Sequence, residues 1–188
     1  MPPKSKRISR ETWLQTGLML LKTEGPTALT VDRLCKEVDR SKGSFYFHFG
    51  SIDPYKETLL LYWEAQHTQV VEDYVASQPN PQAQRLSVPV IAAELDDGVE
   101  RAIRVWAHTE PPARQLIARV DARRIGFVAQ LIVETDGLEP SEARELATIE
   151  YAAFLGFQHL MSGSSADQRQ SMFQRVLHLI SPNNSKDT

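Results

Sequence analysis

Between Thr30 and Phe49 the chain holds two helical patterns that are each too short to bury a core alone. Apolar residues in the first recur at i, i+3, i+4 and i+7, which is one helix face, and Thr30 precedes them as an N-cap. Asp39 interrupts this pattern, and Ser41 then caps a second helix over 42–49. Two short helices joined by a turn of about three or four residues indicate a helix-turn-helix.

The rest of the chain continues the helical pattern. Its apolar residues recur with helical spacing between breaks rich in Gly and Pro, and no segment alternates with period two for long enough to indicate a strand. The sequence therefore predicts an all-α fold. The expected helices span about 9–23, 31–38, 42–49, 53–76, 82–94 (disturbed by Pro89), 98–109, 113–135, 140–161 and 167–180.

Charge is distributed unevenly along this pattern. Residues 1–50 contain nine basic and five acidic side chains, a net charge of +4, whereas the whole chain of 188 residues carries −3, so the remainder carries −7. A basic N-terminal segment indicates a polyanionic partner for that segment. The single cysteine excludes an intramolecular disulfide and favours a reducing compartment, and no apolar run reaches the ~18 residues of a membrane span.

The second short helix has the residue types of a helix that meets DNA. In a helix-turn-helix this helix lies in the major groove, where residues near its N-terminus reach base edges. Lys42 would neutralise a phosphate, Gly43 would let the backbone approach DNA closely, and Ser44 would contact a base edge or a phosphate. Tyr46 and His48 would bond phosphate oxygens through hydroxyl and imidazole.

Phe45 and Phe49 lie four residues apart, so both are expected to pack inward against the preceding helices. An aromatic core helix that binds nothing is the other interpretation, but a Lys-Gly-Ser opening suits a purely structural helix poorly. A basic tail would add a grip on the DNA backbone that is independent of sequence. This tail comprises Lys4, Lys6, Arg7 and Arg10.

One segment, TVDRLCKEVDRSKGSFYFHFGSIDPYKETLL, resembles the DNA-binding domain of the TetR family of bacterial transcriptional repressors. The resemblance runs from about Ser9 to Leu61 and is sharpest in the Lys-Gly-Ser-Phe-Tyr-x-His-Phe run at 42–49. GVERAIRVWA, VDARR and SEARELATIEYAAFLGF are similar, less specifically, to the family's other half. The resemblance implies a three-helix DNA-binding domain at 1–52 and a six-helix ligand-binding and dimerisation domain at 53–188.

The resemblance also implies a function. The chain would be a ligand-responsive transcriptional regulator, with a repressor as the first interpretation and an activator as the second. It would bind a pseudo-palindromic operator in double-stranded DNA as a homodimer. A small-molecule effector of unknown identity would release it. It would need no cofactor or metal, and would work in the bacterial cytoplasm, at the nucleoid when bound to DNA. The expected DNA-binding residues are Thr30, Arg40, Ser41, Lys42, Gly43, Ser44, Tyr46 and His48.

Three positions depart from the family pattern. Asp39 stands where a turn glycine is usual, and Asp tolerates the left-handed conformation better than most residues. Arg40 replaces an apolar turn residue and would project toward phosphate. Ile52 replaces a customary lysine, and Lys56 could supply a phosphate contact one turn later.

Two residue sets in the C-terminal half are expected to serve the effector and the dimer. Aromatic residues there can line a cavity or simply fill the core, and an amphipathic final helix can pack on a partner or on its own domain. The candidate effector residues are Trp106, His108, Phe127 and Tyr151. The candidate dimer residues are Ala152, Gly156, Phe173, Val176, Leu177 and Ile180.

The alternative function is a helical enzyme or ligand carrier whose N-terminal helices are only structural. The chain lacks the phosphate-loop, dinucleotide, hydrolase-elbow and zincin motifs. Glu64 and His67 form one E-x-x-H, but a di-iron bundle needs two such motifs. Cys35 lies on the inward stripe of its helix, where a small core filler is the first interpretation and a redox sensor the second.

Overall fold

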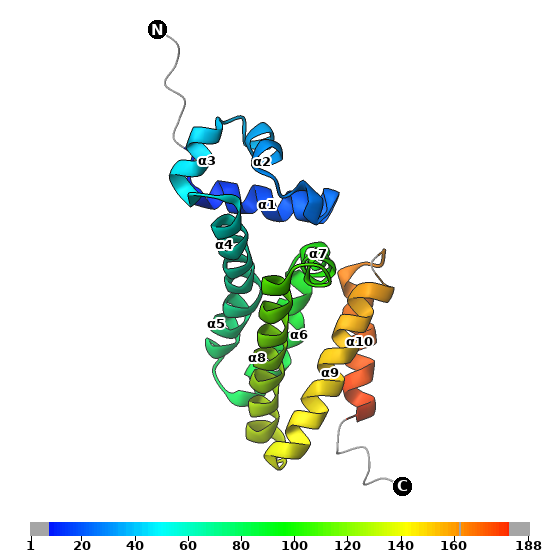
Figure 1. The fold of residues 1–188 in the computed structure, drawn as a ribbon. Coiled ribbons are helices and arrows are strands. Elements are labelled where there is room, and N and C mark those ends of the chain that lie inside the picture. The colour runs from blue at the N-terminus through cyan, green and yellow to red at the C-terminus, as the bar shows by residue number, and fades with distance from the viewer. Residues whose placement is uncertain (1–7, 162, 181–188) are drawn as a thin grey trace. The chain divides into compact units, whose positions relative to one another are not determined.

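The computed structural model of the chain describes residues 8–161 and 163–180. Within these residues the chain is helical and contains no strand, which confirms the all-α fold (Figure 1). The helices are α1 (Arg10–Glu24), α2 (Val31–Val38), α3 (Lys42–Phe49), α4 (Ile52–Glu64), α5 (Val70–Ala76), α6 (Pro81–Glu94), α7 (Asp97–Ala107), α8 (Pro111–Asp136), α9 (Pro140–Leu160) and α10 (Ala166–Ile180), with a 3₁₀ turn at Pro26–Ala28 and a π-helical segment at Ala65–Gln69.

Residues 53–76 are helical as expected, but they do not form one regular α-helix. The region consists of α4, the π-helical segment and α5 in succession, so the C-terminal half contains one helix more than the six expected. π-helical turns are rare and disturb the regular i→i−4 ladder. Pro89, by contrast, lies buried inside an uninterrupted α6.

The chain divides into two compact units that do not coincide with a cut at residue 52. The first contains the residues up to Glu64 together with Gly98–Leu116, and the second contains Ala65–Asp97 together with Ile117 onward. The helix-turn-helix thus belongs entirely to the first unit. The candidate effector and dimer residues beyond residue 117 belong to the second unit.

An aromatic cluster holds the helix-turn-helix to α1 and α4. Phe45 is fully buried and lies 5.5 Å from Trp13 and 5.3 Å from Tyr55, measured between ring centroids. Phe49 completes the cluster at 4.9 Å from Tyr55. The inward packing expected for Phe45 and Phe49 is therefore confirmed. The buried Tyr55 hydroxyl also donates a 2.9 Å hydrogen bond to the backbone carbonyl of Trp13.

Small residues bring α8 and α9 together in the second unit. Ala129 and Ile132 of α8 form a buried cluster with Ala143 and Ala147 of α9. Helix α10 packs against both α9 and α6. The aliphatic residues around this cluster are Ile125, Val128, Val133, Leu138 and Leu146.

Candidate nucleic-acid interface

Capping residues define where α2 begins and ends and where α3 begins. The Thr30 side chain accepts a 3.2 Å hydrogen bond from the backbone N–H of Arg33, which starts α2. Asp39 ends α2 with φ 52° and ψ 57°, and it is the one non-glycine residue with positive φ in the described chain. The left-handed conformation expected at Asp39 is confirmed. Ser41 then caps α3, as predicted, by accepting from the backbone N–H of Ser44.

Helix α3 presents an open face because its aromatic core residues point the other way. Lys42, Gly43 and Tyr46 are exposed, whereas Ser44 and His48 are half-buried. A Cβ built on Gly43 would meet only the Ser41 hydroxyl, at 3.7 Å. Glycine at this position is thus not required by packing within the chain.

Phe47 belongs to this open face, although sequence reasoning did not single it out. Phe47 is 76% exposed, and its ring centroid lies 5.2 Å from that of the adjacent His48. An exposed phenylalanine at the front of a helix can contact thymine methyl groups or deoxyribose. The available signal was its position four residues after Gly43, which places both on one side of the helix.

Several cations near the open face are already paired with acids. Lys42 Nζ lies 2.6 Å from Asp32 Oδ1, and this hydrogen bond raises the pKa of Lys42. Arg40 Nη1 lies 4.0 Å from Asp39 Oδ2, and it donates a 2.6 Å hydrogen bond to the backbone carbonyl oxygen of Asp39. Lys56, considered as a substitute phosphate contact, lies 3.6 Å from Glu110. DNA phosphates must therefore compete with carboxylates for part of this surface.

Arg33 fastens the start of α2 to the end of α1. Its guanidinium donates to both carboxylate oxygens of Glu24, at 3.0 and 2.5 Å, and to Glu37 at 2.7 Å. The paired geometry raises the pKa of Arg33 and lowers that of Glu24. The bidentate pair fixes a direction as well as a distance, so it orients α2 relative to α1.

Arg10 is the described member of the expected basic tail, and it is held within the first unit. Its guanidinium donates to Thr58 Oγ1 at 3.1 Å and lies over the Phe49 ring, 5.2 Å from the centroid. Lys4, Lys6 and Arg7 lie outside the described residues.

The four candidate effector residues are divided between the two units. Trp106 is 1% exposed in the core of the first unit, where His108 is exposed. Phe127 and Tyr151 are half-buried in the second unit. Tyr151 alone of the four takes part in a polar cluster.

That cluster surrounds Arg124, which sequence reasoning missed. The guanidinium donates to Thr68 Oγ1 at 3.0 Å, to the Tyr151 hydroxyl at 3.1 Å and to the carbonyl oxygen of His67 at 3.1 Å. The Tyr151 hydroxyl donates in turn to Asp121 at 2.7 Å. Arg124 thereby connects α8 to α9 and to the π-helical segment.

The candidate dimer residues fall into exposed and buried groups. Ala152 is exposed, and a Cβ built on Gly156 would meet nothing within 4 Å. Val176, Leu177 and Ile180 are half-buried.

Phe173 is instead buried within the second unit, where its ring centroid lies 6.0 Å from that of Phe154. Larger apolar side chains are exposed on the same two helices. They are Ile149 and Leu160 of α9 and Met172 and Leu179 of α10.

None of the helices in the described part of the chain is long and apolar enough to cross a membrane. Among residues 8–161 and 163–180, no group of three or more His, Cys, Asp or Glu side chains is placed to hold a metal ion. Cys35 is buried, and burial raises the pKa of its thiol.

Comparison with known proteins agrees with this architecture. Residues 14–61 match the family model described as bacterial regulatory proteins, tetR family. A proposed TetR-family transcriptional regulator from Rhodococcus sp. is similar in structure, with 18% identity, TM-score 0.75, and coverage of 94% of this chain and 99% of that chain. A comparison with curated protein sequences gives no significant match.

Two further solved structures have the same fold. One is a proposed transcriptional regulator from Saccharomonospora viridis in complex with choline, with 15% identity, TM-score 0.76, and coverage of 90% of this chain and 95% of that chain. The other is a transcriptional regulator from Rhodococcus sp. Rha1, with 15% identity, TM-score 0.72, and coverage of 92% and 96%. At these identities the likeness concerns the fold.

Proposed function

We propose that this protein is a ligand-responsive repressor, because residues 14–61 match the family model of bacterial regulatory proteins, tetR family, and the chain is similar in fold to solved transcriptional regulators. It binds a pseudo-palindromic operator as a homodimer and is released by a small-molecule effector. Its setting is the bacterial cytoplasm, at the nucleoid when bound to DNA.

The observation that carries the DNA-binding proposal is the open face of α3. Lys42, Gly43, Tyr46 and Phe47 are exposed on a helix whose other side is fixed by a buried aromatic cluster. A rigid helix with an exposed N-terminal glycine and lysine suits close approach to a major groove. A helix serving only the core gains nothing from these residues, so this face also disfavours the alternative of an enzyme or carrier with structural N-terminal helices.

A second exposed surface supports the homodimer. Ile149, Ala152, Gly156 and Leu160 follow one another at i, i+3, i+7 and i+11 along α9, which is one helix face. Alanine and glycine allow a partner helix to approach closely, and the larger residues give apolar area to bury. Two subunits related by a twofold axis would present two α3 helices about 34–36 Å apart, one turn of DNA.

Release by an effector follows from the thermodynamic linkage between effector binding and the conformation of the protein. A ligand that binds one conformation better than another shifts the population toward it by its differential affinity. One protein of this fold is in complex with choline, which supports a small-molecule site in the present chain. The second unit contains the polar cluster around Arg124.

Selection of bound fragments from random DNA by the purified chain, followed by titration of the selected operator at several salt concentrations, tests the proposal. Log affinity should fall linearly with log salt, and Lys42→Ala should reduce the slope by about one unit. Lys22→Ala, a lysine on α1 outside the helix-turn-helix, is the matched control and should leave the slope unchanged. No enriched sequence, combined with turnover of a small substrate, would instead favour the enzyme alternative.

The dimer is tested separately with an exposed leucine. Leu179 is 74% exposed on α10, so Leu179→Asp leaves the fold of one subunit intact. It should shift sedimentation toward the monomer and weaken operator binding, because one half-site loses the advantage of the linked second site. Leu86→Asp makes the same change at an exposed leucine of α6, and it should alter neither the sedimentation nor the operator affinity. A Leu179→Asp variant that stays dimeric would remove α10 from the proposed interface.

A further inference from the structure

Phe47 is the most exposed of the large apolar side chains in α2 and α3. It is 76% exposed, whereas Phe45 and Phe49 of the same helix are buried in the aromatic cluster. The core of the first unit therefore makes no use of the Phe47 ring. Single exposed apolar residues are common on protein surfaces, so the position of this ring, more than its exposure, indicates what it does.

Open space lies one helical turn before Phe47, beside Gly43. The two residues are four apart, so they share one face of α3, and helical side chains lean toward the N-terminus of their helix. Among the described residues outside the immediate chain neighbours, a Cβ built on Gly43 would meet only Ser41 Oγ within 4 Å, at 3.7 Å. The Phe47 ring therefore leaves the Gly43 backbone uncovered, and a small group has room between them.

Thymine is the base whose edge suits an aromatic ring at this place. In the major groove all four bases present hydrogen-bond donors or acceptors, and thymine alone adds an apolar C5-methyl group. A phenyl ring that displaces water from a polar base edge leaves that edge without a hydrogen-bond partner, which is unfavourable. Against a methyl group the ring incurs no such penalty, and both apolar surfaces are removed from water.

We propose that Phe47, with the open space beside Gly43, recognises the C5-methyl group of one thymine in each half-site of the operator. This inference rests on the function proposed above, and it names a base-specific contact of the same helix. The methyl group lies against the ring and over the Gly43 backbone, where a larger side chain would exclude it. Phe47 thus supplies sequence specificity, whereas Lys42 supplies affinity that is independent of sequence.

Deoxyribose is the other apolar surface that DNA offers to such a ring. Every nucleotide carries this sugar, so a contact between Phe47 and deoxyribose would support binding to all sequences alike. Replacing thymine by deoxyuridine removes the C5-methyl group and leaves the sugar, the phosphate and the base pairing unchanged. This replacement therefore distinguishes the two contacts on the wild-type chain, without any change in the protein.

The experiment is a titration of the selected operator with deoxyuridine at each thymine in turn, placed symmetrically in both half-sites. Burial of one methyl group corresponds to about a four-fold change in affinity, so its loss from both half-sites should weaken binding about fifteen-fold at one position. An operator in which no thymine responds to the replacement, or one with no thymine common to both half-sites, would overturn the proposal.

Two variants of the full-length chain assign the effect to the ring. Phe47→Ala should bind the thymine and deoxyuridine operators alike, with an unchanged slope of log affinity against log salt, because no phosphate contact is lost. Tyr74→Ala removes an exposed aromatic side chain of α5, outside the helix-turn-helix, and should keep the wild-type response. A folded Phe47→Ala variant that still distinguishes the two operators would refute the assignment. If Phe47→Ala fails to fold, the deoxyuridine titrations of the wild-type chain decide alone.

Methylated cytosine provides the converse measurement. A C·G pair in place of the responsive T·A pair should weaken binding by the wild-type chain, and 5-methylcytosine in that C·G pair should recover about four-fold in affinity per half-site. Phe47→Ala should show no such recovery. Equal affinity of the wild-type chain for cytosine and 5-methylcytosine at this position would contradict a contact between the ring and the methyl group.

The same titrations separate this inference from the function on which it rests. An operator that is bound with the expected salt dependence but responds to no deoxyuridine would refute the methyl contact alone and leave the repressor intact. Failure to enrich any DNA sequence would refute the repressor, and the methyl contact with it.

Discussion

Gly17 on α1 gives the sharpest test of the architecture that positions α3. A Cβ built at this residue would lie 1.9 Å from the hydroxyl oxygen of Tyr55, 3.0 Å from its Cζ and 3.1 Å from Leu59 Cδ1. Tyr55 is fully buried and its hydroxyl donates to the carbonyl of Trp13, so the ring has no exposed position to move into. Gly17→Ala must therefore displace a ring of the cluster that holds α3 in place.

The expected change in the free energy of unfolding is the sum of opposing contributions. Alanine in a helix interior is favoured over glycine by about 0.5–1 kcal/mol. Overpacking a filled core costs about 1–3 kcal/mol, and loss of the Tyr55 hydrogen bond costs about 1 kcal/mol. We expect Gly17→Ala to lower the free energy of unfolding by about 1–3 kcal/mol. Urea unfolding followed by circular dichroism measures this change.

A double-mutant cycle isolates the contact. Tyr55→Phe removes the oxygen that the new Cβ would meet at 1.9 Å, so Gly17→Ala should cost less in the Tyr55→Phe background than alone, by about 1 kcal/mol or more. Gly43→Ala is the matched control, because its Cβ has room, and it should stabilise the chain slightly while weakening operator binding. A Gly17→Ala variant as stable as wild type, or the absence of coupling with Tyr55→Phe, would refute the reasoning.

Three further predictions concern charge and backbone. Asp32→Asn should raise the affinity for nonspecific DNA a few-fold, most at low salt, because Lys42 loses its competing carboxylate; titrations at two salt concentrations check this. Arg85→Met should destabilise the chain by about 3–5 kcal/mol at pH 8, since it leaves the Glu150 carboxylate buried without its guanidinium. Burial already raises the pKa of Glu150, and loss of Arg85 raises it further. The loss in the free energy of unfolding should therefore shrink toward pH 5, because the carboxyl takes up a proton. Denaturant unfolding at both pH values measures this difference. Asp39→Ala should lower the free energy of unfolding by about 1 kcal/mol and Asp39→Gly should not, because Gly tolerates φ 52°; a similar loss in both variants would contradict this account.

The helices could be predicted closely because their signals are local. Thr30 and Ser41 were each expected to cap a helix, and each side chain accepts a hydrogen bond from a backbone N–H three residues on. Helical periodicity likewise identified Phe45 and Phe49 as core residues. These signals lie within one turn of the residue concerned, so the linear sequence contains them in full.

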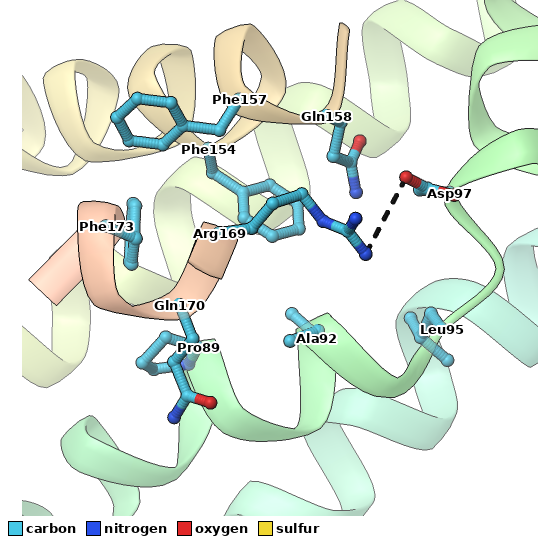
Figure 2. A pocket seen from close by; sticks show the side chains of 11 residues that line it. Pro89, Ala92, Leu95, Asp97, Phe154, Phe157, Gln158, Arg169, Gln170 and Phe173 are labelled. Atoms are coloured by element: carbon cyan, nitrogen blue, oxygen red, sulfur yellow. Dashed lines mark ion pairs between the residues drawn. The ribbon is translucent and has the colours of Figure 1, made fainter. Parts of the chain in front are cut away.

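The polar clusters of the second unit were not predictable in the same way, because their residues meet only in the folded chain. Asp97 of α7 and Arg169 of α10 are far apart in sequence, yet their side chains form an ion pair (Figure 2). The π-helical segment has no sequence signal of its own, yet one of its carbonyl groups accepts a hydrogen bond from Arg124, more than fifty residues away. Tyr151 was one of the candidate effector residues, but its hydrogen-bond partners Arg124 and Asp121 were not among them.

The basic N-terminal segment shows why a count of charges is a poor measure of DNA binding. Counterion release depends on the phosphates that a protein neutralises, and a cation already held by a carboxylate must first give up that partner. Arg33 is held by Glu24 in a bidentate geometry and also donates to Glu37, whereas Lys42 pairs with one exposed aspartate. The exposed pair contributes little to stability and is readily exchanged, since water screens it. We therefore expect Arg33 to act in the structure of the domain and Lys42 to act in the salt-dependent contact with DNA, although the two residues add equally to the net charge.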